Sequence, residues 1–151
     1  MNSSEGSISE IEQDALLQEI GGMLLSSAPE DWEEVTMSHY AVVDRSTTDS
    51  EFIRNDGSKE SFFPPSEILE KLDELRNGMY TPKKGTWFSA RYVITRPGNY
   101  RIDYNYDEEP AFTIPPVAGS YKLDLQHFPR DDEHIPDWLR RKLQEAEGEQ
   151  Q

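Results

Sequence analysis

Two acidic segments carry residue types that could bind a metal ion. In Asp103-Tyr-Asn-Tyr-Asp107, oxygen ligands alternate as they do at the start of an EF-hand calcium loop. The rest of that motif is missing, because Glu108 stands where a glycine must turn the chain and Ile114 stands where a bidentate glutamate must close the site. The same alternation is typical of the wet face of a strand, and we favour that interpretation.

The second segment, residues 131–134, contains three carboxylates and one imidazole. Adjacent residues rarely converge on one metal ion without ligands from elsewhere. The other histidines, His39 and His127, form no H-E-x-x-H motif. An exposed acidic loop is the simpler interpretation, and a metal-dependent hydrolase that uses Asp131, Asp132 and His134 is kept as an alternative.

No motif marks a nucleophile or a phosphate cradle. The chain has no cysteine, which removes thiol catalysis, thiolate metal ligands and disulfides. The patterns G-x-S-x-G, G-x-x-x-x-G-K-[ST] and G-x-G-x-x-G do not occur. Nothing selects a catalytic pair among the 30 acidic residues. We therefore expect a protein that is not an enzyme, with no cofactor, no metal and no catalytic residue.

The crowding of like charges is the feature that folding does not explain, because neighbouring carboxylates repel one another. Such clusters do serve to meet a basic surface, where complementary potentials raise the association rate. We predict a partner-binding surface made of the acidic residues of both segments, with solubility alone as the competing explanation. The predicted binding residues are Asp103, Asp107, Glu108, Glu109, Asp131, Asp132 and Glu133.

The overall charge narrows the class of partner. Fifteen lysines and arginines against 30 acidic residues leave a net charge of −15. Such a field repels nucleic acid, so the expected macromolecular partner is a basic protein. The charge also disfavours self-association through an exposed strand edge, and we expect a monomer rather than a homodimer.

No membrane or export segment is recognisable. The longest apolar runs, such as Met23-Leu24-Leu25, are far shorter than the roughly 18 residues that a span needs. Residues 1–10 lack the basic and apolar regions of a signal peptide. We expect a cytoplasmic protein without membrane contact.

Periodicity predicts the elements that position these residues. Capping boxes at Ser7 and Ser9 start a helix that Pro29 ends, and Ser66 and Ser120 are predicted to cap two further helices. Alternating apolar residues predict strands, the hairpin turn Asp56-Gly57 among them. The expected strands are 32–43, 51–54, 59–63, 86–95, with Phe88, Ala90, Tyr92 and Ile94 on one face, and 100–107.

The order of these elements predicts an α+β fold: an antiparallel sheet of about five strands with helices packed on one face. A last helix starts at Pro136 and carries Leu139, Leu143 and Ala146. The 151 residues are enough for one domain, which we place at residues 8–143. The polar ends, residues 1–7 and 144–151, are predicted to be disordered tails.

Three segments resemble the YezG-like family of bacterial immunity proteins. They are Gly85-Thr-Trp-Phe-Ser-Ala-Arg-Tyr92, Tyr100-Arg-Ile-Asp-Tyr-Asn-Tyr-Asp-Glu-Glu-Pro110 and Phe128-Pro-Arg-Asp-Asp-Glu-His-Ile-Pro-Asp-Trp-Leu139. The resemblance covers roughly residues 30–143. It implies a small cytoplasmic antitoxin that inhibits a secreted polymorphic toxin by occlusion, with no catalytic residue to carry over.

The resemblance and the charge lead to one hypothesis: an immunity protein that occludes a basic toxin domain. Family members are best known with nuclease toxins. The acidic forms of these motifs resemble a branch of the family, which leaves the toxin's activity open between a nuclease and another activity such as NAD glycohydrolysis. The expected docking surface is the wet face of residues 100–107, its exit loop and Asp131–Glu133. Charge reversal at Asp103, Asp107 and Glu108 should then slow association. A toxin-secretion chaperone is the second alternative, beside the hydrolase.

Overall fold

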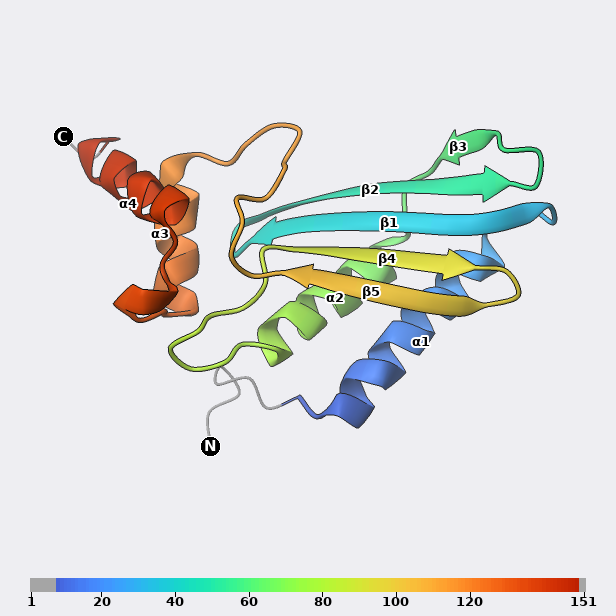
Figure 1. Cartoon of the computed structure of the whole chain (residues 1–151), viewed down its shortest axis with the longest axis horizontal. Coiled ribbons are helices and arrows are strands. Elements are labelled where there is room, and N and C mark those ends of the chain that lie inside the picture. Colours follow the sequence, from blue (N-terminus) through green and yellow to red (C-terminus); the bar gives the residue numbers. More distant parts are fainter. Residues whose placement is uncertain (1–7, 150–151) are drawn as a thin grey trace.

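The computed structural model describes residues 8–149 and contains a five-stranded antiparallel sheet with helices beside it (Figure 1). The strands lie in the order β3-β2-β1-β4-β5. The predicted α+β fold is therefore confirmed. The elements are α1 (Glu10–Ser26), β1 (Trp32–Val42), β2 (Arg45–Arg54), β3 (Lys59–Ser61), α2 (Ser66–Gly78), β4 (Ser89–Thr95), β5 (Asn99–Asn105), α3 (Ala118–His127), the 3-10 turn η2 (Asp132–His134) and α4 (Asp137–Glu149).

Helix α1 begins where its capping box predicts. The Glu12 N–H donates to Ser9 Oγ at 3.1 Å, and the Ser9 N–H donates to the Glu12 carboxylate at 3.0 Å. These bonds also lower the pKa of Glu12, because they favour its charged form. The second predicted capping box begins at Ser7, which lies outside the described residues, as does the predicted tail 1–7.

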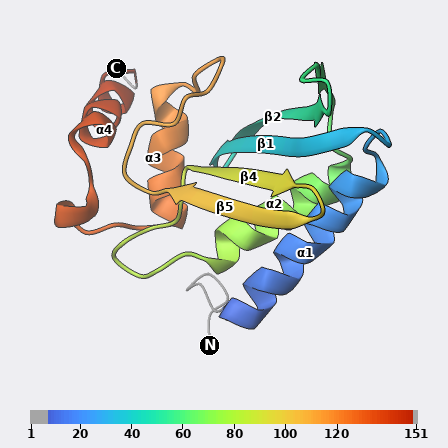
Figure 2. The ribbon, with the colours of Figure 1, turned by 45° about the vertical axis from the view of Figure 1, so that its right-hand side comes forward.

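Helices α1 and α2 cover one face of the sheet, and no helix within residues 8–149 covers the other (Figures 1 and 2). The main core lies between these layers and includes Ile20 of α1, Leu72 of α2, and Val35 and Tyr92 of the sheet. Helices α3 and α4 pack against each other beyond one end of the strands. A second core lies there, formed by Val42, Phe88, Tyr121 and Leu139.

A buried ion pair connects these two parts. Arg76 of α2 contacts the Asp124 carboxylate of α3 through two nitrogens, at 2.8 and 3.0 Å, and both side chains are buried. The Arg76 Nε also donates to the carbonyl of Trp87 at 2.7 Å. A buried charge is tolerated only when it is paired and hydrogen-bonded, so this contact fixes α3 relative to α2 and the sheet.

Strand β2 begins at Arg45, earlier than the predicted start at Glu51, and a tight turn at Val43-Asp44 joins it to β1. Residues 46–49 are serine, threonine and aspartate and show no apolar alternation. That stretch lies at the edge of the sheet, where period-two burial does not shape the sequence. The backbone pairing of Arg45 with Val42 therefore had no signal in side-chain hydrophobicity.

The prediction that Phe88 lies on the same face as Tyr92 was wrong. Phe88 belongs to the second core, and Trp87 is fully buried in the main core instead. The Phe88 N–H donates at 2.7 Å to the carbonyl of Asn105, the residue that already pairs with Ser89. One extra residue at this point shifts the alternation of side chains, as a bulge does.

The predicted serine caps of two helices were also wrong. Pro65 occupies the cap position of α2 and Val117 that of α3, and neither provides a side-chain hydrogen bond. Ser66 is already helical, and the Ser120 hydroxyl donates to the Asp44 carboxylate at 3.3 Å.

The domain boundary at residue 143 and the tail 144–149 need correction, because α4 continues through Glu149. Ala146 is buried and continues the stripe of Leu139. Residues 150–151 of the predicted tail lie outside the described residues.

Candidate functional site

The first acidic segment leaves β5 in a loop that a side chain holds in place. The Asn105 amide donates to the Glu108 carbonyl at 2.9 Å, and the Glu108 N–H donates back to Asn105 Oδ1 at 2.9 Å. Asp107, Glu108 and Glu109, which we call the strand-exit acids, are exposed. A fixed backbone therefore presents three carboxylates to solvent.

The second acidic segment, Asp131, Asp132 and Glu133, forms the turn acids. The Asp131 N–H donates to the Lys83 carbonyl at 2.8 Å, which ties the segment to the loop before β4. The Asp131 carboxylate lies 2.5 Å from Nδ1 of His134, across the turn η2. Asp132 and Glu133 are exposed.

Arg130 joins the two segments. Its buried guanidinium donates to the carbonyls of Tyr106 at 2.8 Å, His134 at 3.0 Å and Thr86 at 3.0 Å. Asp107 Oδ1 lies 3.7 Å from the same guanidinium. Burial lowers the pKa of Arg130, and the three carbonyls supply the hydrogen bonds that the buried cation requires. We call the surface formed by the strand-exit acids and the turn acids the acidic end.

Gly85 makes room for this arginine. It has φ +86°, and an added Cβ would lie 2.4 Å from Arg130 Nε. The three segments that carry the family resemblance therefore meet at Arg130: one provides Gly85 and Thr86, one provides Tyr106, and one contains Arg130 itself. In this structure their shared role is to hold the backbone of the acidic end.

Of the seven predicted binding residues, the structure brings six together at the acidic end and leaves Asp103 apart. Asp103 lies on the open face of β5, whereas Asp107 lies in the loop that follows the end of the strand at Asn105. Its carboxylate is 3.4 Å from Arg101. The wet face of β5 therefore carries both charges and is not the uniformly acidic surface that the hypothesis requires.

Some carboxylates of the acidic end also have cationic neighbours. Glu109 lies 3.7 Å from Lys142 of α4, and Arg140 donates to the Asp132 carbonyl at 3.0 Å. Within residues 8–149 the carboxylates of Glu108 and Asp132 make no ion pair. Asp131 and Glu133 contact only His134. Of the four carboxylates without a lysine or arginine partner, those of Glu108, Asp132 and Glu133 belong to exposed residues and are the most accessible to a partner.

A second acidic surface, on helices α1 and α2, was missed from the sequence. Helices α1 and α2 contain four carboxylates each, against two cations, Lys71 and the buried Arg76. Lys71 bonds Glu19 at 2.6 Å, and this hydrogen bond raises the pKa of Lys71. The exposed residues Glu70, Asp73 and Glu74 of α2 belong to this acidic helix face. Acidic residues spaced three or four apart lie on the same side of a helix. A search for acidic residues that are adjacent in the sequence does not find them.

For the metal-binding alternative, the structure brings together only part of a ligand set. Ligand atoms of Asp131, Glu133 and His134 lie within 4.8 Å of one another. All three belong to one surface turn, and Asp132, which the hydrolase hypothesis used, is not in the group. Zinc sites generally take three or four protein ligands from a supported framework. No further histidine or carboxylate within residues 8–149 completes this group.

Comparison with models of known protein families and with curated proteins found no match. Among residues 8–149, none of the helices has the length and apolar content needed to cross a membrane. The fold class of the described residues is α+β.

Proposed function

We propose that this protein is an immunity protein that binds a basic toxin domain through its acidic end and covers the toxin's active site. The observation that supports the proposal most is the meeting of two acidic segments, distant in the sequence, on one exposed surface around Arg130. The resemblance to the YezG-like family supports the same class of function.

Inhibition by occlusion needs no reactive group on this chain. It needs carboxylates on a backbone that does not have to be ordered on binding, since ordering costs affinity. Asn105 fixes the loop of the strand-exit acids, and Arg130 with the Lys83 carbonyl fixes the turn acids. The acidic end is therefore preorganised for docking.

The chemistry of the target follows from its substrate. A nuclease must attract a polyanion and so presents a cationic face, and an enzyme that binds NAD must also accommodate phosphates. Complementary potentials would steer the acidic end to such a face and exclude the substrate. Glu108, Asp132 and Glu133 are the residues expected to make the new ion pairs.

Co-expression with the toxin domain encoded by the neighbouring gene tests the proposal. The wild-type chain should restore growth and co-purify with the toxin domain. A variant with Glu108→Lys, Asp132→Lys and Glu133→Lys should fold and fail in both assays. No rescue and no complex with the wild-type chain would contradict the proposal.

The same experiment separates the chaperone alternative. A chaperone for secretion would bind the full toxin precursor and would not protect cells from the isolated toxin domain. The hydrolase alternative is tested by adding Zn²⁺ or Mn²⁺. A metal-dependent rise in melting temperature that is lost in His134→Ala would favour it over an immunity protein.

A further inference from the structure

The outer edge of β2 is only partly covered. Strand β3 pairs with Glu51, Phe52 and Ile53, and the Phe62 N–H then donates to the Ser50 carbonyl at 3.1 Å. After this bond the chain turns away toward α2. Within residues 8–149 no strand pairs with residues 45–49 on that side.

The direction of the free backbone groups follows from the pairing. In an antiparallel ladder the N–H and C=O of alternate residues point to the same side. The carbonyl of Ser50 and the N–H of Arg54 bond outward, the latter to Ser58 at 2.9 Å. By the same alternation Thr48 and Ser46 direct their N–H and C=O groups outward. A row of such groups can pair with another strand.

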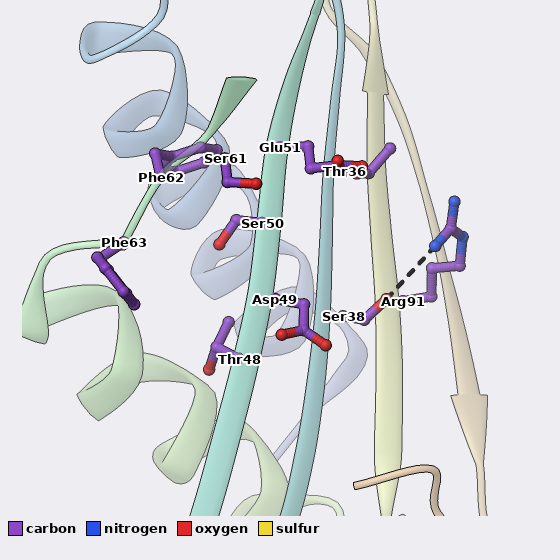
Figure 3. Close-up of a pocket in the computed structure, with 10 residues that line it drawn as sticks. All are labelled: Thr36, Ser38, Thr48, Asp49, Ser50, Glu51, Ser61, Phe62, Phe63 and Arg91. Carbon is purple, nitrogen blue, oxygen red and sulfur yellow. Dashed lines mark hydrogen bonds between the residues drawn. The ribbon is translucent and has the colours of Figure 1, made fainter. Parts of the chain in front are cut away.

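A groove of about 480 Å³ begins at this edge and extends over the open face of the sheet as far as Arg91 of β4. Phe63, with 94% of its surface exposed, lies across the groove from Thr48 and Ser50 (Figure 3). Ser50 is 95% buried, yet its hydroxyl has no hydrogen-bond partner within residues 8–149. The unpaired buried hydroxyl costs free energy in the isolated protein, and a ligand in the groove would offer it a partner and would also cover Phe63.

The two sides of the edge differ in chemistry. In an added strand, the side chain opposite Thr48 would face the helix side. There Phe62, which already occupies the position opposite Ser50, stacks on Phe52 at 3.9 Å between ring centroids. Side chains on the other side would meet Asp49 and Glu51 on the open face. Arg91, also on that face, donates to Ser38 Oγ at 3.4 Å, on the far side of β1 from the edge.

We propose that the outer edge of β2 is a strand-addition site that binds an extended segment of a partner protein in which apolar and basic residues alternate. The apolar residues would contact Phe63, the basic ones Asp49 and Glu51, and the backbone would pair with Ser46 and Thr48. This site is separate from the acidic end, and it can be tested without a toxin.

The test uses the full chain and a fluorescein-labelled peptide of alternating lysine and valine, followed by fluorescence polarisation. We expect saturable binding that falls about tenfold or more in Phe63→Ala, as for an interface anchor. The matched control is Ile11→Ala in α1, another exposed apolar residue, which should change the affinity less than twofold. Ser50→Ala should weaken binding about fivefold without lowering stability, because the hydroxyl is unpaired in the free protein.

Two further peptides test the mode of binding. Methylation of alternate backbone amides should abolish binding if the peptide adds as a strand, and replacing lysine by glutamate should abolish it if Asp49 and Glu51 select basic residues. No saturable binding of the lysine-valine peptide, or equal binding of the methylated peptide, would overturn the proposal. A dimer of this chain that Phe63→Ala dissociates would assign the edge to a second copy and overturn it as well.

Discussion

His39 is a buried histidine whose environment sets a pH dependence. It lies on the face of the sheet that α1 and α2 cover. Its Nδ1 is 2.8 Å from Thr48 Oγ1, and its ring contacts Trp87 edge-on. Burial, and then the positive charge of Arg76, lower the pKa of His39 to about 4. The folded protein therefore resists protonation at this residue, whereas the unfolded chain accepts the proton near pH 6.5.

Stability should consequently fall as the pH drops from 6.5 toward 4, because the unfolded state binds the extra proton. The loss from His39 should approach about 3 kcal/mol at the acid end of this range. Urea denaturation at several pH values measures it, with His39→Gln as the comparison. The variant should lose the pH-dependent difference, and a slope unchanged by the substitution would rule out His39 as its source.

Arg130 is a structural cation whose geometry a lysine cannot reproduce. Three carbonyls accept from its guanidinium, and one ammonium group cannot reach all of them. Arg130→Lys should lower the free energy of unfolding by about 2–4 kcal/mol. The matched control, Arg141→Lys on the exposed side of α4, should stay within about 0.5 kcal/mol. Chemical denaturation measures the free energy of unfolding of both variants. An equal loss in the two would contradict this role of Arg130.

Helix α1 contains two neighbouring glycines whose surroundings differ. An added Cβ at Gly21 would lie 2.7 Å from the Tyr92 hydroxyl, which donates to the Leu17 carbonyl at 2.6 Å. At Gly22 nothing lies within 4 Å. Gly22→Ala should stabilise the protein by about 0.5–1 kcal/mol through helix propensity. Gly21→Ala should destabilise it, because α1 must move off the sheet.

Thermal denaturation of the two glycine variants checks this packing of α1 on the sheet. Opposite shifts in melting temperature are expected. A Gly21→Ala protein as stable as Gly22→Ala would mean that α1 does not approach β4 this closely.

The elements could be predicted wherever burial imposes a period on the sequence. The stripe of α1 and the alternation of Tyr92 and Ile94 specify one buried face each, and both were found. The start of β2 was missed because its polar edge residues have no buried face. Trp87 lies in the main core in place of Phe88 because one extra residue stands opposite Asn105. The alternation of apolar residues does not predict such an insertion.

The candidate site could be predicted only in its parts. Each acidic run was visible as a cluster, but their meeting depends on the buried contacts of Arg130 with Tyr106 and His134. These contacts join residues that are far apart in the chain, and the spacing of residues in a single sequence does not predict them.

The net charge of −15 can attract a basic partner in two ways. It can act through the field of the whole molecule, or mainly through the carboxylates of one surface. Helices α1 and α2 carry eight carboxylates against two cations, so net charge alone would steer a basic partner to the acidic helix face as well as to the acidic end. The proposed function requires the acidic end to be the docking surface. Two variants with equal total charge separate these possibilities.

The most direct test measures the association rate constant with the toxin domain encoded beside this chain, at several salt concentrations. One variant carries Glu108→Lys, Asp132→Lys and Glu133→Lys, and the other carries Glu70→Lys, Asp73→Lys and Glu74→Lys. The first should slow association about tenfold or more at low salt and flatten its salt dependence, while the second should change it less than about threefold. Equal slowing by both variants, or no slowing by the first, would contradict docking through the acidic end.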